Sequence, residues 1–459
     1  MSLSQLMALS PVDGRYHMKT RALAPFFSEY GLIHYRLKIE IAWFCSLAAL
    51  PEIPELPPLS EEALHFLTQI AENFSEKEAL EIKTIEATLN HDLKALEYYL
   101  KNTFQSCPEL APLTEFIHFA CTSEDINNLA YACMIKEACI KIMYPRLHDL
   151  FTCLHEQAQK YADLPMLSRT HGQAATPTTL GKEFANFAAR LQDPMVLIQS
   201  PFLKGKINGA VGNFNAHCVA YPKIDWLAHN EAFVKSLGLS WNPYTTQIEP
   251  HDAMVALFQV FQRINSILID LARDFWGYIS LGYFKQKAVE TEVGSSTMPH
   301  KINPIDFENA EGNLGVANAL FTHLVSHLPL SRWQRDLTDS TLLRNIGTAF
   351  AHSLIGYTAL LSGFQKIAPE KELIQAQLAS HWDLLSEAVQ TVMRRAHLPA
   401  PYEQLKAFTR GKKIDEASLH AFIQQLNLAP ADKEALLALT PATYTGLAER
   451  LARNLTPKT

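Results

Sequence analysis

Long stretches without proline are the feature of this sequence that most restricts its fold. Proline interrupts helices because it lacks a backbone N–H and its ring clashes with the preceding turn. Between residues 254 and 278, apolar residues recur at steps of three and four, as in a helix buried along one side. The sequence therefore predicts long helices packed as a bundle, with proline-free stretches at 113–144, 251–298, 305–328 and 330–368.

The same reasoning predicts an all-α fold, since strand-like alternation is scarce. Ser60 before two glutamates, and Thr176 before Pro177, predict two helix starts, because a hydroxyl at the N-cap accepts the N–H groups of the first turn. We expect three helical domains: an N-terminal domain at 1–111, a central bundle of long helices at 112–365, and a C-terminal domain at 366–459.

The formal net charge of −7 gives the chain no overall basic field for nucleic acid or anionic lipid. An anionic ligand would therefore need a local cluster of Arg and Lys. The first residues lack the basic start and apolar core of a secretory signal, and no apolar run is long enough to cross a bilayer. The seven cysteines include no C-x-x-C pair, which predicts reduced thiols in a cytoplasmic protein. We expect neither nucleic acid nor a membrane as a partner.

One loop carries the strongest functional signal. Residues 294–304 read GSSTMPHKINP and lie between two helix-compatible segments. Their composition alone favours a plain linker, but their identity resembles the signature loop of the fumarase/aspartase superfamily, whose members release fumarate from a succinyl unit. The resemblance implies that Ser295 is the general base. It also implies that Lys301 and Asn303 stabilise the charge that builds up on the neighbouring carboxylate.

The leaving nitrogen needs a proton donor, and a histidine can supply one near neutral pH. Any one of 18 histidines is more often structural than catalytic. His171, in Ser168-Arg169-Thr170-His171-Gly172-Gln173, stands out because its neighbours resemble a second motif of adenylosuccinate lyases, which implies that it is the general acid. His91, in the segment Asn90-His91-Asp92, resembles the histidine that the family places beside the acid.

Four further segments resemble the substrate-binding segments of the adenylosuccinate lyase family, in its long-chain bacterial-type branch. The resemblance covers about residues 10–441. It implies Arg15 and Tyr16 near the phosphate and ribose, Thr122 and Ser123 at the succinyl carboxylate, Gln247 as a polar contact, and a cationic cluster. The substrate-binding residues that we expect are Arg15, Tyr16, Asn90, His91, Asp92, Thr122, Ser123, Gln247, Lys301, Asn303, Arg335, Ser340 and Arg344.

The resemblance also implies a reaction, an assembly and the lack of a cofactor. The reaction is elimination of fumarate from adenylosuccinate and from the earlier aminoimidazole intermediate SAICAR. The assembly is a homotetramer whose helical bundles merge and whose active sites are shared between subunits. We expect no metal, because Leu324 lies between His323 and His327 where the zinc-protease motif needs Glu.

Two other interpretations stay open at this point. One is a superfamily lyase for argininosuccinate, malate or aspartate, although the arginines favour a phosphorylated substrate. The other is a catalytically silent structural protein on the same fold, which the intact Ser295, His171, Lys301 and Asn303 disfavour.

Overall fold

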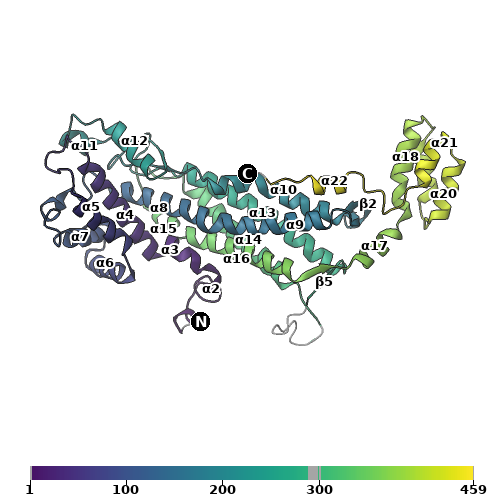
Figure 1. Cartoon of the computed structure of the whole chain (residues 1–459), viewed down its shortest axis with the longest axis horizontal. Coiled ribbons are helices and arrows are strands. Elements are labelled where there is room, and N and C mark those ends of the chain that lie inside the picture. The colour runs from purple at the N-terminus through teal and green to yellow at the C-terminus, as the bar shows by residue number, and fades with distance from the viewer. Residues whose placement is uncertain (1–2, 288–297, 299–300, 458–459) are drawn as a thin grey trace. The chain divides into compact units, whose positions relative to one another are not determined.

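Helices make up most of the described chain, and strands make up little of it (Figure 1). A computed structural model describes residues 3–287, 298 and 301–457. The chain forms two compact units, each made of three separate stretches. The first unit comprises Met1–Leu147, Pro194–Ser266 and Gly312–Thr358, and the second comprises His148–Asp193, Ile267–Glu311 and Ala359–Thr459. The prediction of a helical fold is confirmed, whereas the division into three domains stays a prediction.

Helix α4, Glu29–Ala48, forms the core of the N-terminal part of the first unit. It begins at Ser28, whose side chain accepts the N–H of Gly31 at 3.1 Å. Buried residues occur all around it, because it packs against α3, α5, α6, α7 and α8. The other elements of this unit are α1 (Leu3–Leu6), α2 (His17–Thr20), α3 (Ala24–Phe27), α5 (Glu61–Glu72), α6 (Glu76–Leu89), α7 (Asp92–Phe104), α8 (Ser123–Ala138), α11 (Asn215–Ala220), α12 (Trp226–Ser236), α15 (Thr338–Leu343), 3₁₀ turns at Arg21–Leu23 and Ala111–Phe116, and a π-helical turn at Cys139–Met143.

Five long helices contribute residues to both units, and they include the predicted helix at 254–278. In the first unit, four phenylalanines from these helices pack with ring centroids 4.7 to 6.1 Å apart: Phe258, Phe261, Phe321 and Phe350. The five helices are α9 (Tyr144–Lys160), α10 (Leu180–Gln199), α13 (Asp252–Ser280), α14 (Ile305–His327) and α16 (Ile346–Gln365).

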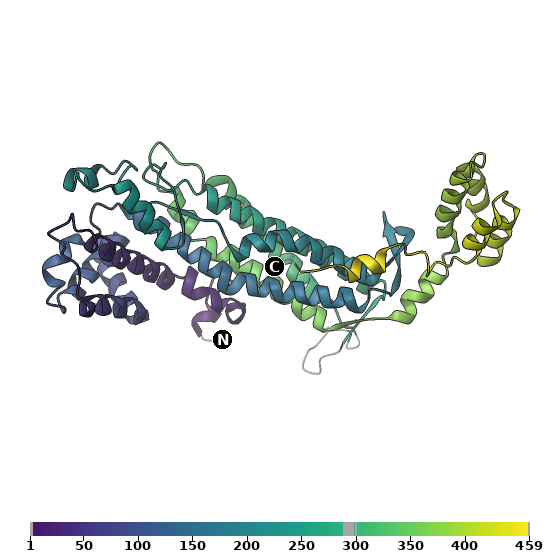
Figure 2. The same ribbon diagram turned by 45° about the horizontal axis from the view of Figure 1, so that its top comes forward.

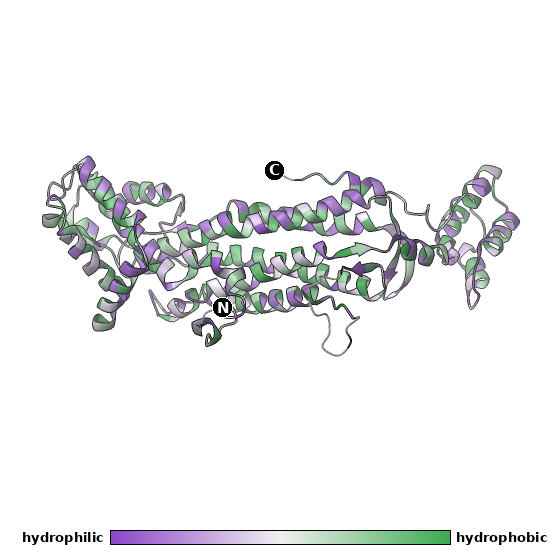
Figure 3. Ribbon diagram, turned by 60° about the horizontal axis from the view of Figure 1, so that its bottom comes forward, coloured by the Kyte–Doolittle hydropathy of each residue, from purple (hydrophilic) through white to green (hydrophobic). Residues whose placement is uncertain are grey.

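Helix α13 is the one helix among the described residues that is long and apolar enough to cross a membrane. In its most apolar window, 56% of the residues are buried inside the protein. Hydrophobic and hydrophilic residues alternate around the long helices (Figure 3). This pattern is typical of core helices in a bundle. The apolar character of α13 is therefore only weak evidence for a membrane span.

The second unit contains its own aromatic cluster, in which Phe184, Phe275, Phe307 and Phe364 pack with centroids 4.7 to 6.2 Å apart. The helices between residues 386 and 437 gather in one group (Figure 2) around buried residues that include Leu385, Met393 and Ile423. The helices and turns that lie wholly in this unit are α17 (Lys371–Ala379), a 3₁₀ turn at Trp382–Leu385, α18 (Ser386–Arg395), α19 (Pro401–Thr409), α20 (Glu416–Gln425), α21 (Pro430–Leu437) and α22 (Ala448–Arg453).

The few strands of the described chain form three two-stranded pairs. Antiparallel β1 (Pro165–Thr170) and β2 (Gln173–Thr179) form a hairpin, β3 (Lys204–Gly205) pairs with β4 (Ser240–Trp241), and β5 (Phe284–Gln286) pairs with β6 (Ile367–Pro369). The helix start predicted at Thr176-Pro177 is wrong, because both residues lie in β2 and the Thr176 hydroxyl bonds Glu387. The start predicted at Ser60 is confirmed, since its Oγ accepts the N–H of Ala63 at 3.1 Å.

A buried ion pair in the first unit should make stability depend on pH. His118 Nδ1 lies 2.6 Å from Oε1 of Glu40, whose side chain is 1% exposed. Burial acts to lower the pKa of His118, but the charge and hydrogen bond of Glu40, together with the charges of Glu97 and Asp125, outweigh burial and the pKa is raised. Because its pKa is higher in the folded state than in the unfolded state, His118 contributes its full stabilisation below about pH 6.5, the ordinary pKa of histidine. This stabilisation is lost as the pH rises through the folded-state pKa.

We therefore expect His118→Gln to lower the free energy of unfolding by about 1.5–3 kcal/mol at pH 6 and by clearly less at pH 9. Urea unfolding at the two pH values measures the difference. His65→Gln, at an exposed position on α5, is the control and should show no such pH dependence. An equal loss at both pH values for His118→Gln would contradict the assignment.

Candidate active site

His91 lies at the start of α7, in the first unit. Asn90 adopts the left-handed conformation (φ 52°) at the end of α6, and the turn makes His91 the N-cap of α7. The Nδ1 atom of His91 accepts the backbone N–H of Lys94 at 3.1 Å. A neutral imidazole that accepts through Nδ1 carries its proton on Nε2. The exposed His91 can therefore offer an Nε2–H donor to a ligand.

Asp92 follows His91 and joins two arginines. Its Oδ2 atom lies 2.8 Å from Nη2 of Arg36 and 3.1 Å from Nη2 of Arg344. Burial acts to raise the pKa of Asp92, but the charges of Arg36 and Arg344 help to hold it below its ordinary value. Arg344 also donates to Oγ of Ser340 at 2.6 Å. The structure thus brings Asp92, Ser340 and Arg344 together, as members of one predicted site should be.

Thr122 and Ser123 lie at the N-terminal end of α8. Thr122 is the N-cap, and its N–H donates to Oδ2 of Asp125 at 2.8 Å. Helix N-termini carry N–H groups and a partial positive charge, which favour a carboxylate ligand. Both residues are half-buried, so this end of α8 suits the predicted contact with a succinyl carboxylate.

Arg335 connects the segment before α15 to α8. Its Nη1 atom lies 3.0 Å from Oε1 of Glu124, and its Nη2 atom lies 3.7 Å from Oδ1 of Asp339. The adjacent Gln334 accepts the backbone N–H of Gln247 at 3.2 Å. Arg335 and Gln247 are therefore positioned next to the N-terminal end of α8.

Asn127 completes the connection to Asp92. Its side chain donates to Oε1 of Glu124 at 2.8 Å and accepts from Nε of Arg36 at 2.8 Å. A continuous series of ion pairs and hydrogen bonds therefore links Arg344 to Arg335. The residues between them are, in order, Asp92, Arg36, Asn127 and Glu124. The three arginines pair with the carboxylates of Asp92, Glu124 and Asp339, and Arg344, whose side chain is 39% exposed, is the most accessible of them to an anionic ligand.

A pocket of about 380 Å³ opens beside Arg344. Arg15 and Tyr16 belong to the segment that provides much of its lining, although neither lines it in this structure. Arg15 is exposed, and its guanidinium carbon lies 6.0 Å from the centroid of the Tyr16 ring. The lining residues are Val12, Asp13, His17, Thr20, Arg21, Leu23, Ala24, Phe27, Ser28, Glu29, Arg344, Gly347, Thr348 and Ala351.

His171 belongs to the second unit and lies at the tip of the β1–β2 hairpin. Thr170 pairs with Gln173, so His171 and Gly172 form a two-residue turn, with φ of 52° and 74°. Such turns require positive φ at both positions and usually contain Asn or Gly. A histidine in this conformation is uncommon, and uncommon backbone conformations concentrate at functional sites. His171 is exposed at this tip of the hairpin.

Lys301 and Asn303 lie just before α14, in the second unit. Lys301 is exposed, and its N–H donates to the carbonyl of Met298 at 3.0 Å. The carbonyl of Ile302 accepts from Nε2 of Gln286 at 2.8 Å, which ties this segment to the end of β5. The predicted base Ser295 lies outside the described residues.

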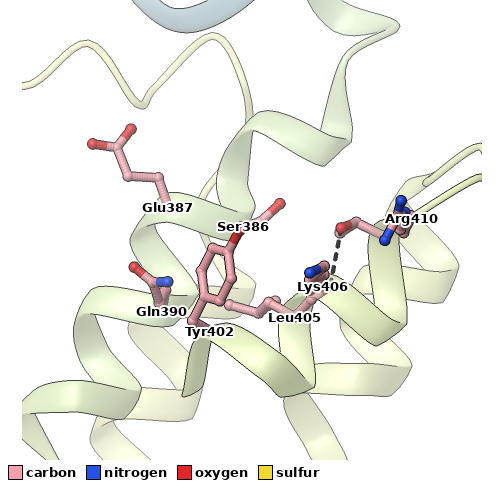
Figure 4. Close-up of a pocket in the computed structure, with 8 residues that line it drawn as sticks. Ser386, Glu387, Gln390, Tyr402, Leu405, Lys406 and Arg410 are labelled. Carbon is pink, nitrogen blue, oxygen red and sulfur yellow. Dashed lines mark hydrogen bonds between the residues drawn. The ribbon is translucent and has the colours of Figure 1, made fainter. Parts of the chain in front are cut away.

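A second pocket, of about 420 Å³, lies among the C-terminal helices of the second unit. Figure 4 shows Glu387 and Gln390 on one side of the Tyr402 ring, and Lys406 and Arg410 on the other. None of the residues predicted for the active site lines this pocket.

Sequence reasoning missed Arg36, Glu124, Asn127 and Asp339, which connect the predicted residues of the first unit. Arg36 lies within α4, where apolar residues surround it, and its side chain is 3% exposed. A charge within such an apolar segment needs a buried partner. That requirement was the signal that could have identified Arg36.

Comparison with known proteins agrees with the geometry. Residues 14–318 match a family described as lyase, and residues 331–445 match one described as adenylosuccinate lyase C-terminal. The structure superposes on a 3-carboxy-cis,cis-muconate lactonizing enzyme from Pseudomonas putida with a TM-score of 0.72 and 20% identity, covering 94% of this chain and 95% of that one. This likeness concerns the fold alone.

The helical fold and these matches define a lyase of the fumarase/aspartase superfamily. Two relatives narrow the class further. The adenylosuccinate lyase of Legionella pneumophila (strain Corby) is 55% identical over 99% of both chains, and that of Escherichia coli (strain K12) is 52% identical over 98% of both. The chain belongs to the adenylosuccinate lyase family.

Proposed function

We propose that this chain eliminates fumarate from adenylosuccinate to give AMP, and from SAICAR to give AICAR, in purine nucleotide biosynthesis. The observation that carries the proposal is the continuous cluster of the first unit. It joins the cationic group Arg344, suited to a phosphate, to the N-terminal end of α8, suited to a carboxylate. A succinylated nucleotide carries both kinds of anion.

The chemical step needs a base, an acid and stabilisation of charge. Ser295 removes a proton from the carbon next to a carboxylate, and His171 protonates the nitrogen as the C–N bond breaks. The electron pair of the C–H bond forms the double bond of fumarate. Lys301 and Asn303 stabilise the carboxylate while it carries extra negative charge. These roles rest on the family resemblance.

The nucleotide and succinyl parts contact different residues. Arg15, Tyr16, Ser340 and Arg344 bind the phosphate and ribose. Thr122 and Ser123 bind the succinyl carboxylate, assisted by His91. Asn90, Asp92, Gln247 and Arg335 complete the polar lining. The contacts of Asp92 with Arg344 and of Arg335 with Glu124 support this grouping.

The working enzyme is a homotetramer in the cytoplasm, with active sites shared between subunits. Three features support this proposal. Large apolar side chains such as Val196, Leu197 and Val316 are 42 to 47% exposed on the long helices of a single chain, and such surfaces favour association. All seven cysteines, every one of them described, are free thiols, as in a reducing compartment. The residues proposed for catalysis fall in both units.

Incubating the purified protein with adenylosuccinate tests the function directly. We expect AMP and fumarate in equal amounts, measured by chromatography and by absorbance. Argininosuccinate, malate and aspartate serve as comparison substrates, and none should react at a similar rate. Fumarate release from one of these alone would identify a different superfamily lyase. No release from any of them would favour a catalytically silent protein.

Arg344→Ala is expected to raise KM for adenylosuccinate by about 10- to 100-fold, because it removes a charge-assisted bond to the phosphate. The value of kcat should change much less if that bond is equally strong in the ground and transition states. Arg36 continues to pair with Asp92 at 2.8 Å, so the variant should fold. Arg453→Ala removes an arginine that pairs with Glu449 at 2.9 Å and is the matched control. An unchanged KM for Arg344→Ala would remove the phosphate assignment.

A further inference from the structure

Asp125 and Lys206 form an ion pair that the predicted catalytic residues do not explain. Nζ of Lys206 lies 2.9 Å from Oδ1 of Asp125, and both side chains are 0% exposed. Burying two charges is costly, and an apolar pair of similar size often stabilises a fold equally well. Asp125 lies in the first turn of α8, three residues after Thr122. The pair therefore lies directly beneath the segment that we assign to the succinyl carboxylate.

Both oxygens of the Asp125 carboxylate are fully used. Oδ1 accepts from Nζ of Lys206 and from the N–H of Asn208, each at 2.9 Å. Oδ2 accepts the N–H of Thr122 at 2.8 Å and the N–H of Gly209 at 3.1 Å. One carboxylate thus fixes the backbone of Thr122 to the turn at 206–209.

The turn itself is held at both sides of Lys206. The Asn128 side chain accepts the N–H of Lys206 at 2.9 Å and donates to its carbonyl at 3.0 Å. The Lys206 ammonium also donates to the carbonyl of Gly209 at 3.2 Å. Gly209 has a φ of +85°, which favours glycine. These contacts fix the position of the turn relative to α8.

The far end of this turn contacts the segment of Gln247. Nδ2 of Asn208 donates to Oγ1 of Thr245 at 2.8 Å, and Nε2 of Gln247 donates to the carbonyl of Ala210 at 2.9 Å. Gly212 has a φ of +84°, and a Cβ there would lie 2.3 Å from the carbonyl oxygen of Thr245. The turn at 206–212 therefore bridges the predicted substrate contacts Thr122 and Gln247.

We propose that Asp125 and Lys206 are positioning residues, which fix the succinyl-binding N-terminus of α8 against the turn at 206–212 and the Gln247 segment. The inference rests on the proposed function. An aspartate is needed because all the groups that surround its two oxygens are donors. An asparagine would turn one oxygen into an NH₂ group that faces an N–H. Lys206 balances the charge of the carboxylate and completes the turn through Gly209.

Product inhibition separates positioning from simple loss of stability. Fumarate should bind through the Thr122–Ser123 segment, whereas AMP should bind through Arg344 and its neighbours. In Asp125→Asn and Lys206→Met we expect the inhibition constant of fumarate to rise about tenfold or more, because a carboxylate site that shifts by a fraction of an ångström loses its hydrogen bonds. The constant for AMP should stay within about threefold. Inhibition constants do not depend on the fraction of protein that is folded.

Two controls match the substituted residues in type. Asp225→Asn changes an aspartate that caps α12 by accepting the N–H of Ala228 at 3.1 Å. Lys136→Met changes a lysine on α8 that donates to the carbonyl of Gly238 at 2.6 Å. Both controls should keep the two inhibition constants of the unmodified enzyme.

A double variant covers the case in which the single variants fail to fold. Asp125→Asn with Lys206→Met leaves no uncompensated buried charge, and it should still show weakened inhibition by fumarate. Inhibition by fumarate as strong as in the unmodified enzyme, in any folded variant, would overturn the inference and leave the pair a purely structural role. If the unmodified protein releases no fumarate from adenylosuccinate, the proposed function fails before the variants are compared.

Discussion

Ser295→Ala should lower turnover of adenylosuccinate by about 10²–10⁴-fold, the usual cost of losing a general base. The C–H proton is weakly acidic, and no water molecule held in the same place would be as strong a base as an alkoxide stabilised by nearby positive charge. The substitution removes one oxygen atom, so substrate affinity and folding should change little. SAICAR should be affected to the same extent, because the succinyl half is common to both substrates.

The neighbouring serine gives a matched control. Ser296 is the next residue in the same loop, and Ser296→Ala makes the same chemical change one position away. Stopped-flow absorbance should show a large loss of rate for Ser295→Ala and a small one for Ser296→Ala. More than a few per cent of the original rate in Ser295→Ala would contradict its role as the base. A larger loss in Ser296→Ala would transfer that role to Ser296.

The helices were predictable because the interactions that stabilise them are local. The apolar spacing at 254–278 corresponds to α13, and Ser60 caps α5 as its sequence indicates. The hairpin is different. Thr176 is held in β2 and bonds Glu387, which lies 211 residues further along the chain. A contact between residues so far apart in the sequence leaves no signal in the residues near Thr176. The Thr-Pro pair therefore resembled a helix start.

The candidate site was predictable only in part for the same reason. The segments around Asp92, Ser123 and Arg335 were identified by resemblance, but the residues that join them were not. Arg36 bonds Asp92 and Asn127, which lie 56 and 91 positions away, and neither spacing follows from helix periodicity. The Asp125–Lys206 pair is equally remote in sequence. Physical reasoning from sequence could indicate which charges need partners, but not which partners they have.

The acid and base roles proposed for His171 and Ser295 lead to the other large expected effect. His171 lies on a hairpin of the second unit, while the substrate cluster lies in the first. Because the resemblance to the family implies active sites shared between subunits, we propose that His171 and Ser295 of one active site come from different subunits of the tetramer. His171→Ala and Ser295→Ala should each be inactive as pure proteins, because each lacks either the acid or the base.

Mixing these two inactive proteins should restore activity. In randomly mixed tetramers, about a quarter of the sites would receive an intact His171 from one chain and an intact Ser295 from another. The mixture should therefore reach about a quarter of the normal rate after co-refolding.

The control mixture pairs Ser295→Ala with Lys301→Met. These residues lie six positions apart in one segment. If each site takes that segment from a single chain, every site carries one of the two mutations. The control mixture should therefore stay inactive. Co-purification through a tag on one variant shows whether mixed tetramers have formed. If they form and the first mixture still has no activity, His171 and Ser295 belong to the same chain in each site, because every site then carries one mutation.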